Sequence, residues 1–278
     1  LQSAESGIKF FVLGALSSGI LLYGCSLIYG FTGSTNFNDI FTTISSLDNL
    51  NLGIIFGLVF ILVGLAFKIS AVPFHMWAPD VYEGSPTSVT LFFTMVPKIA
   101  ALTVFIRFLY VPFLNLIDQW QMIIIFLSLA SMIFGAVSAI GQKNLKRLIA
   151  YSSIGHMGYA LAGLAVGTNS GIQSSIIYIS IYLIMNLGIF CCLFMMKRKD
   201  KFFDNLEDLA GLSKNHPIIS LSLLILLFSL AGIPLLAGFF AKFYIFEDIV
   251  IHHIISCSCK RIVSIFFIIL PHIIYISL

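Results

Sequence analysis

Charged side chains are scarce in this chain of 278 residues: they make up 10% of it, whereas hydrophobic residues make up 59%. A soluble domain carries about 25% charged residues and roughly 45–50% apolar ones. This composition excludes a disordered chain or a disulfide scaffold, and the net charge of +3 is too small to indicate a nucleic-acid partner. With a mean hydropathy of +1.04, the sequence predicts a protein that crosses a membrane several times.

Two signatures of redox enzymes are missing as well. The sequence contains neither a glycine-rich nucleotide-binding loop nor a cysteine cluster spaced for an iron–sulfur centre. We interpret its cysteines as small apolar residues; they are Cys25, Cys191, Cys192, Cys257 and Cys259. A zinc site formed by the last two with His252 and His253 is an alternative, but its spacing differs from known ligand patterns. We therefore expect this chain to bind no cofactor and no metal.

Apolar runs of about 20 residues, the length that crosses the hydrocarbon core, recur along the chain. They are too long for the strands of a membrane barrel, so an all-α membrane bundle of seven or eight spans is expected. The seven clear segments are 7–30, 53–77, 88–110, 120–140, 147–167, 172–196 and 216–246. An eighth candidate, 262–278, is weaker because Pro271 interrupts it.

Lysine and arginine are confined to alternate loops. The loops 78–87, 141–147 and 197–215 together carry Lys143, Lys146, Arg147, Lys197, Arg198, Lys199, Lys201 and Lys214. The opposite loops, 30–52, 111–119 and 168–171, contain no lysine or arginine but hold Asp39, Asp48 and Asp118. The positive-inside rule then places the basic loops in the cytoplasm of a bacterium or in the matrix of a mitochondrion.

Lys98 lies deep in an apolar segment. It is about ten residues from either end, or roughly 15 Å at 1.5 Å per residue, and a lysine stem of about 6 Å does not reach the interface from there. Insertion scales give such a charge a cost of about 2.5–3.5 kcal/mol. Lys98 is therefore a candidate for proton or ion transfer. The alternative is a structural lysine bonded to the backbone carbonyls that the neighbouring Pro97 frees.

Lys68 and Lys242 each lie near a proline that interrupts an apolar segment. Pro73 follows Lys68, and Pro234 precedes Lys242. Broken helices recur at the ion sites of transporters, and their freed carbonyls can hold water. Because successive loops alternate between the two sides of the membrane, the two segments run in opposite directions. We therefore expect an inverted repeat. The alternatives are a snorkelling lysine at a helix end for Lys68 and a surface lysine for Lys242.

His156 lies centrally in its segment, where it is either a proton relay or a neutral, hydrogen-bonded core histidine. No aspartate or glutamate lies in the middle of any segment, and Glu5 lies at a membrane edge. Buried amines need anions or must lose their charge. We therefore expect a counter-charge from an upstream helix or a neighbouring subunit.

Three stretches carry a resemblance to a known family. They are FKISAVPFHMWAPDVYEGSPTSVT, KNLKRLIAYSSIGHMGY and SLAGIPLLAGFFAKFY. They resemble subunit 2 (subunit N) of proton-pumping NADH:quinone oxidoreductase, respiratory complex I. The resemblance implies a partial antiporter-like, proton-translocating domain over 1–246, several helices upstream of it, and a divergent tail over 247–278. It also implies the inner mitochondrial membrane, or the plasma membrane if the chain is bacterial.

The resemblance further implies roles for individual residues. Lys68, Lys98 and Lys242 would form a polar axis along which protons move, with His156 as a candidate relay, while Glu5 has a secondary role. Flavin and iron–sulfur clusters would belong to partner subunits, and the partners would be other membrane-arm subunits and the lipid bilayer. A stand-alone cation/proton antiporter and a structural membrane subunit without a proton path are the alternatives.

Overall fold

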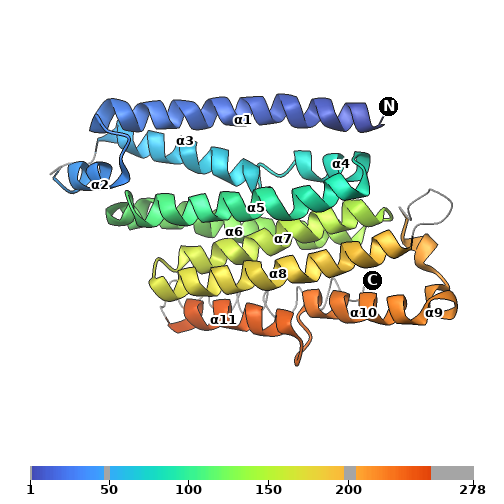
Figure 1. Cartoon of the computed structure of the whole chain (residues 1–278). Helices are drawn as coiled ribbons and strands as arrows, with labels where there is room; N and C mark the ends of the chain where they lie inside the picture. Colours follow the sequence, from blue (N-terminus) through green and yellow to red (C-terminus); the bar gives the residue numbers. More distant parts are fainter. Residues whose placement is uncertain (1, 47–50, 197–204, 252–278) are drawn as a thin grey trace.

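The computed structural model describes residues 2–46, 51–196 and 205–251, and these residues form helices without a strand (Figure 1). In chain order the helices are α1 (Gln2–Thr32), α2 (Phe37–Ser45), α3 (Leu52–Lys68), α4 (Trp77–Gly84), α5 (Thr87–Tyr110), η1 (Leu114–Leu116), α6 (Ile117–Ile140), α7 (Leu145–Ala165), α8 (Asn169–Met195), η2 (Leu206–Leu209), α9 (Leu212–Asn215), α10 (Pro217–Ala231) and α11 (Ala237–Ile251). The long helices lie side by side along one direction, with α1 at one edge and the α10–α11 pair at the other.

Every clear apolar segment of the sequence coincides with a helix or a pair of helices. By length and composition, four helical stretches of the described chain can cross a membrane: Ser3–Thr32, Thr87–Tyr110, Leu114–Ile140 and Asn169–Met195. The predicted all-α membrane bundle is confirmed. The candidate segment 262–278 and most of the predicted tail 247–278 lie outside the described residues.

The segments 53–77 and 216–246 are each broken in two, as their prolines predict. The first break separates α3 from α4, and the indole Nε1 of Trp77 spans it by donating to the carbonyl of Phe67 at 2.9 Å. The second break begins at Gly232, whose φ of +88° ends α10 in a left-handed conformation that favours glycine. The α3–α4 and α10–α11 pairs run in opposite directions (Figure 1), in keeping with the predicted inverted repeat.

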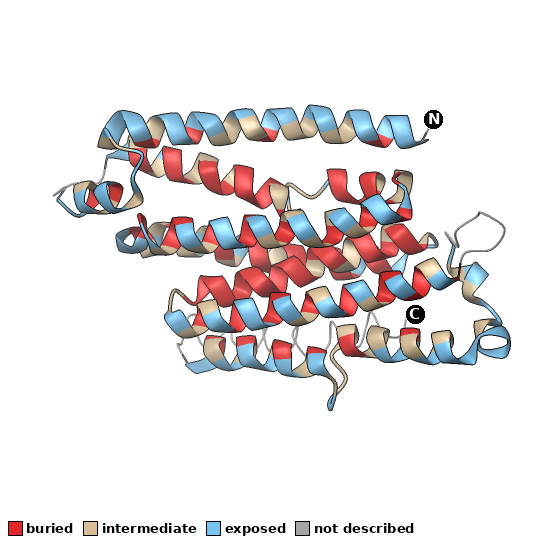
Figure 2. Ribbon diagram, viewed as in Figure 1, coloured by how far each residue is buried: buried red, intermediate tan, exposed pale blue. Residues whose placement is uncertain are grey.

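Helix α7 is the centre of the bundle. Its residues are mostly buried, whereas α1, α10 and α11 expose broad apolar faces (Figure 2). It packs closely on α6, where a Cβ at Gly158 would approach the backbone oxygen of Ser128 to 2.9 Å. Small residues allow this approach, so Gly158 permits the close packing of α7 on α6.

The loops predicted to share the basic side meet at one end of the bundle, which we call the basic end. Lys146 Nζ donates to the carbonyl of Ser85 at 3.2 Å, and the amide of Leu206 donates to the carbonyl of Lys143 at 3.0 Å. At the opposite end, Asn115 Nδ2 donates to Ser45 Oγ at 2.6 Å. The loop parity read from the sequence therefore agrees with the fold. Lys197, Arg198, Lys199, Lys201 and Asp48 lie outside the described residues.

Candidate functional site

Lys98 is completely buried, with 0% of its surface exposed. Its Nζ, on α5, donates to Ser153 Oγ of α7 at 2.7 Å and lies 5.6 Å from the centre of the Tyr82 ring of α4. Ser153 Oγ in turn donates to the carbonyl of Ala150 at 2.7 Å. Within the described residues this ammonium has no carboxylate partner. The Lys98 ammonium is therefore stabilised by the hydroxyl of Ser153 and the ring face of Tyr82.

Pro97 does not supply the partner of Lys98. Proline lacks an N–H, so the carbonyl four residues before it, that of Phe93, loses its helical hydrogen bond. Tyr82 Oη donates to that carbonyl at 3.1 Å. The alternative in which Lys98 bonds to carbonyls freed by Pro97 is therefore wrong, because the tyrosine already satisfies the carbonyl and the lysine bonds across to α7.

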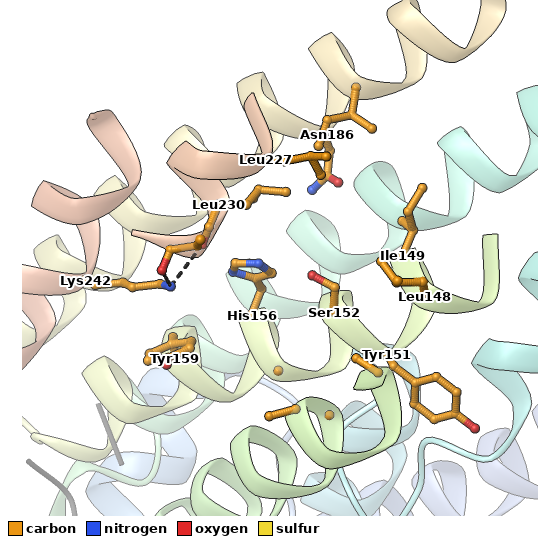
Figure 3. A pocket seen from close by; sticks show the side chains of 16 residues that line it. Leu148, Ile149, Tyr151, Ser152, His156, Tyr159, Asn186, Leu227, Leu230 and Lys242 are labelled. Carbon is orange, nitrogen blue, oxygen red and sulfur yellow. Dashed lines mark hydrogen bonds between the residues drawn. The ribbon is translucent and has the colours of Figure 1, made fainter. Parts of the chain in front are cut away.

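Lys242 folds back onto the break between α10 and α11. Its Nζ donates to the carbonyls of Leu230 at 2.9 Å and Ala231 at 3.0 Å (Figure 3). It also lies 5.1 Å from the centre of the Tyr159 ring of α7. This half-buried lysine is thus held by the interrupted backbone, and the surface-lysine alternative does not describe its position.

On α7, His156 lies in sequence between Ser153, which contacts Lys98, and Tyr159, whose ring lies beside Lys242. Its Nδ1 is 2.6 Å from Tyr178 Oη on α8, and its ring centre is 5.0 Å from that of Tyr182. The imidazole is buried among aromatic rings and hydrogen-bonded, as expected of a satisfied core histidine. The same contacts also suit a relay, so the predicted relay role stays a prediction.

A cavity of about 60 Å³ runs along α7 beside His156. Figure 3 shows His156 and Ser152 projecting from α7, with Lys242 approaching from α11. Side chains of α6, α8 and α10 complete its lining, and most of them are apolar. A water molecule needs a space of about 10–15 Å³ and two or more polar partners. The cavity, which His156 and Lys242 both line, therefore has room for water.

Lys68 is not part of this arrangement. It is the last residue of α3 and is half-buried, and it makes no hydrogen bond or ion pair with the residues that the structure describes. Its neighbour Phe67 packs against Trp77, with ring centres 5.6 Å apart. Trp77 itself is buried in a core cluster with Phe67. The structure thus places Lys68 at the break, while its role in proton transfer stays a prediction.

The sequence analysis did not predict the set of ion pairs at the basic end. Lys9 Nζ lies 2.7 Å from Glu5 and 2.8 Å from Asp80, and Arg147 lies 2.8 Å from Glu83. These pairs join α1, α4 and α7 around a polar cavity of about 200 Å³. Glu5 is thereby paired with Lys9 and is not a partner of the buried lysines. The spacing of Glu5 and Lys9, four residues apart on one helix, was the available signal.

Replacing Ser153 by alanine tests the environment of Lys98. The change removes the hydroxyl that accepts from Nζ, and a buried charged donor without its partner is destabilised by about 1–3 kcal/mol. We expect the melting temperature of the purified protein to fall, as measured by thermal denaturation in detergent. Ser180→Ala is the matched control, because Ser180 is exposed and bonds only its own helix. Equal melting temperatures of the two variants would contradict the contact between Ser153 and Lys98.

In the described residues, two broken helices run in opposite directions, and Lys98 and Lys242 are held without a carboxylate partner. These features define an antiporter-like membrane protein. The chain belongs to the NADH:quinone oxidoreductase/Mrp antiporter transmembrane family, whose model matches residues 1–267.

Its relatives include one subunit of NADH-quinone oxidoreductase from several bacteria. Subunit N of Pelagibacter ubique is 74% identical over 250 residues, which are 90% of this chain and 52% of the relative. Subunit N of Parvibaculum lavamentivorans is 58% identical over 245 residues, covering 88% and 50% of the two chains. This chain therefore spans about half the length of these relatives.

Solved structures share the fold over the whole chain. A chain of respiratory complex I from Thermus thermophilus matches with a TM-score of 0.78 and 31% identity, over 100% of this chain and 59% of that one. A chain of the archaeal membrane-bound sulfane sulfur reductase matches at 0.86 and 28%, over 100% and 56%. The Mrp complex of a Dietzia species, at 0.86 and 24% identity over 100% and 51%, shows the fold alone.

Proposed function

We propose that this chain is part of a subunit N of a proton-pumping NADH:quinone oxidoreductase and that it moves protons through Lys68, Lys98 and Lys242, with His156 as a relay. The observation that carries the proposal is Lys98, a fully buried amine held by the hydroxyl of Ser153 and the ring of Tyr82. The similarity to bacterial subunits N supports it. The proposed translocating domain is 1–246, with a divergent tail over 247–278.

Proton transfer of this kind follows from the physics of buried amines. Burial disfavours the charged form of an amine, and a nearby anion favours it. An anion that moves or is neutralised therefore drives a proton off such a group. Moving one charge against the membrane potential requires about 2.3 kcal/mol per 100 mV. A change of about two pKa units supplies comparable energy, at about 1.36 kcal/mol per unit.

The oxidation of NADH and the reduction of ubiquinone belong, in this proposal, to partner subunits that carry flavin and iron–sulfur clusters. In the described part of the chain, no group of three or more His, Cys, Asp or Glu side chains could hold a metal ion. The counter-charge for the buried lysines would come from a neighbouring helix or subunit. The membrane would be the inner mitochondrial membrane, with the basic end in the matrix, or a bacterial plasma membrane, with that end in the cytoplasm; the relatives named above are bacterial.

A stand-alone cation/proton antiporter is a second candidate, favoured by a family that also includes Mrp antiporters. Such a protein would need acidic ion-binding side chains within its spans. The acidic groups that form ion pairs in the described residues, such as Glu83 and Asp80, lie at the basic end instead. The complex I subunit is therefore the better-supported proposal.

The test is to purify from its native membrane the complex that contains the full-length subunit. We expect flavin and iron–sulfur subunits in the same particle, and NADH-driven acidification when the particle is reconstituted in liposomes. A particle without redox subunits that exchanges cations for protons would instead establish the antiporter.

A further inference from the structure

The two side chains that hold the Lys98 ammonium come from different helices. Tyr82, whose ring centre lies 5.6 Å from Nζ, belongs to α4, and Ser153, whose hydroxyl lies 2.7 Å from Nζ, belongs to α7. This arrangement persists only while α4 keeps its position relative to α7. Helix α4 has eight residues, and isolated helices shorter than about 12–15 residues are marginal. The position of α4 must therefore come from contacts with its neighbours.

A buried apolar cluster covers the inner face of α4. The cluster contains Trp77, Ala78, Val81 and Tyr82 of α4 and Ala150 of α7. Apolar burial is favourable but non-directional. The cluster thus brings α4 against α7, while the rotation of the short helix and its register along α7 depend on directional contacts.

Ion pairs on the outer face of α4 supply such directional contacts. Asp80 and Glu83 are three residues apart and so lie on one face of the helix. Arg147 of α7 contacts both: Nη1 donates to Glu83 Oε2 at 2.8 Å, and Nη2 lies 3.5 Å from Asp80 Oδ1. The other oxygen of Asp80 accepts from Lys9 Nζ of α1 at 2.8 Å. The donors of a guanidinium form a rigid fork, so these pairs fix the orientation of α4 as well as its distance.

The ion pairs and the partners of Lys98 lie on the same two helices. On α7, Arg147 is six residues from Ser153, or about 9 Å along the axis. On α4, Asp80 is two residues from Tyr82. The two helices are therefore joined once at the basic end and once around the ammonium. Because a helical turn moves as a unit, a rotation of α4 at Asp80 also displaces the ring of Tyr82.

We propose that Asp80 is a positioning residue that, with Arg147 and Lys9, holds α4 so that the ring of Tyr82 stays over Lys98. Asp80 acts through Tyr82 and does not itself carry the proton. Without its charge, α4 is released from α1 and held to α7 by one ion pair fewer, so the ring leaves the ammonium. The proposal rests on the proposed function and adds to it the contact that keeps the surroundings of Lys98 in place.

Asp80→Asn tests the proposal in the complete complex with the full-length subunit. Asparagine keeps the size of the side chain but removes the charge that both cations contact. We expect NADH-driven pumping to fall roughly fivefold, the effect of losing two partly exposed ion pairs, and Asp80→Glu to restore most of it. Asp39→Asn is the matched control, because Asp39 is an exposed carboxylate of α2 at the opposite end and contacts the hydroxyl of Ser34.

The same substitution in a Tyr82→Met background shows whether Asp80 acts through the ring. Methionine fills the space flexibly but lacks the aromatic face. We expect Tyr82→Met to lower pumping and Asp80→Asn to add no further loss to it, since residues that act through one another are not additive. A further fivefold loss in the double variant would overturn the proposal, because Asp80 would then act independently of Tyr82.

Lys98→Met, measured in parallel, separates this inference from the proposed function. Defective pumping by Lys98→Met with normal pumping by Asp80→Asn would overturn the positioning role and leave the function standing. Normal pumping by Lys98→Met would remove the proposed function itself.

Lys9→Met and Lys9→Arg repeat the test if Asp80→Asn does not assemble. Methionine removes one of the two cations, so a loss of roughly twofold is expected, while arginine keeps the pair and pumps normally. Normal pumping by Lys9→Met would contradict the proposal. Failure of both Asp80→Asn and Lys9→Met to assemble would overturn it as well, because the ion pairs would then serve stability alone.

Discussion

Replacing Lys98 by methionine is expected to leave the complex assembled and to lower its NADH-driven proton pumping by roughly a hundredfold. Methionine fills a similar volume beside Ser153 and Tyr82, but it cannot bind a proton. Pumping is measured as acidification per NADH oxidised in liposomes, and assembly by native gel electrophoresis.

Lys214→Met is the control for this change, because Lys214 is an exposed lysine on α9. Normal pumping by an assembled Lys98→Met complex would refute the role of this residue. Failure of that complex to assemble would favour a structural membrane subunit, in which Lys98 only joins α5 to α7.

Gly238→Ala is expected to prevent assembly. A Cβ at this position would collide with the carbonyl oxygen of Ser229, and its carbon would lie only 2.7 Å away. Both obstacles are backbone atoms of α10, so no side-chain rotation relieves the collision. Overpacking of this kind lowers the stability of the fold by about 1–3 kcal/mol. Because the obstacle is rigid, we expect a loss near the upper end of that range. The yield of intact complex from the membrane measures the effect.

Gly14→Ala is the matched comparison, because a Cβ on that glycine of α1 meets nothing within 4 Å. Alanine favours helix over glycine by about 0.5–1 kcal/mol, so this variant should assemble as well as the unaltered chain. Equal yields of the two variants would show that α10 and α11 are not packed as closely as described.

Local patterns account for most of the fold. Hydropathy located the long helices, of which four stretches can cross a membrane by length and composition. Prolines located both breaks, and the distribution of lysine and arginine located the basic end. These features depend on a residue and its near neighbours in the chain. The depth of Lys98 was likewise predictable, because it follows from counting residues inward from both ends of one helix.

The partners of the buried groups could not be predicted in the same way. Ser153 lies 55 residues from Lys98 in sequence, and only the packing of α7 against α5 brings them together. The indole of Trp77 bonds across the first break to the carbonyl of Phe67, ten residues away in sequence, and only the folded path of the chain shows this contact.

The break after α10 has an electrostatic consequence for Lys242. The carbonyls of Leu230 and Ala231, which this lysine contacts, are the last of α10, and a helix C-terminus carries about half a negative elementary charge. In an uninterrupted helix, both carbonyl oxygens would accept hydrogen bonds from the next turn of the same helix. Because α10 ends at Ala231, its last carbonyls act as a partial counter-ion for Lys242. They do so in the middle of the segment 216–246, which contains no acidic side chain.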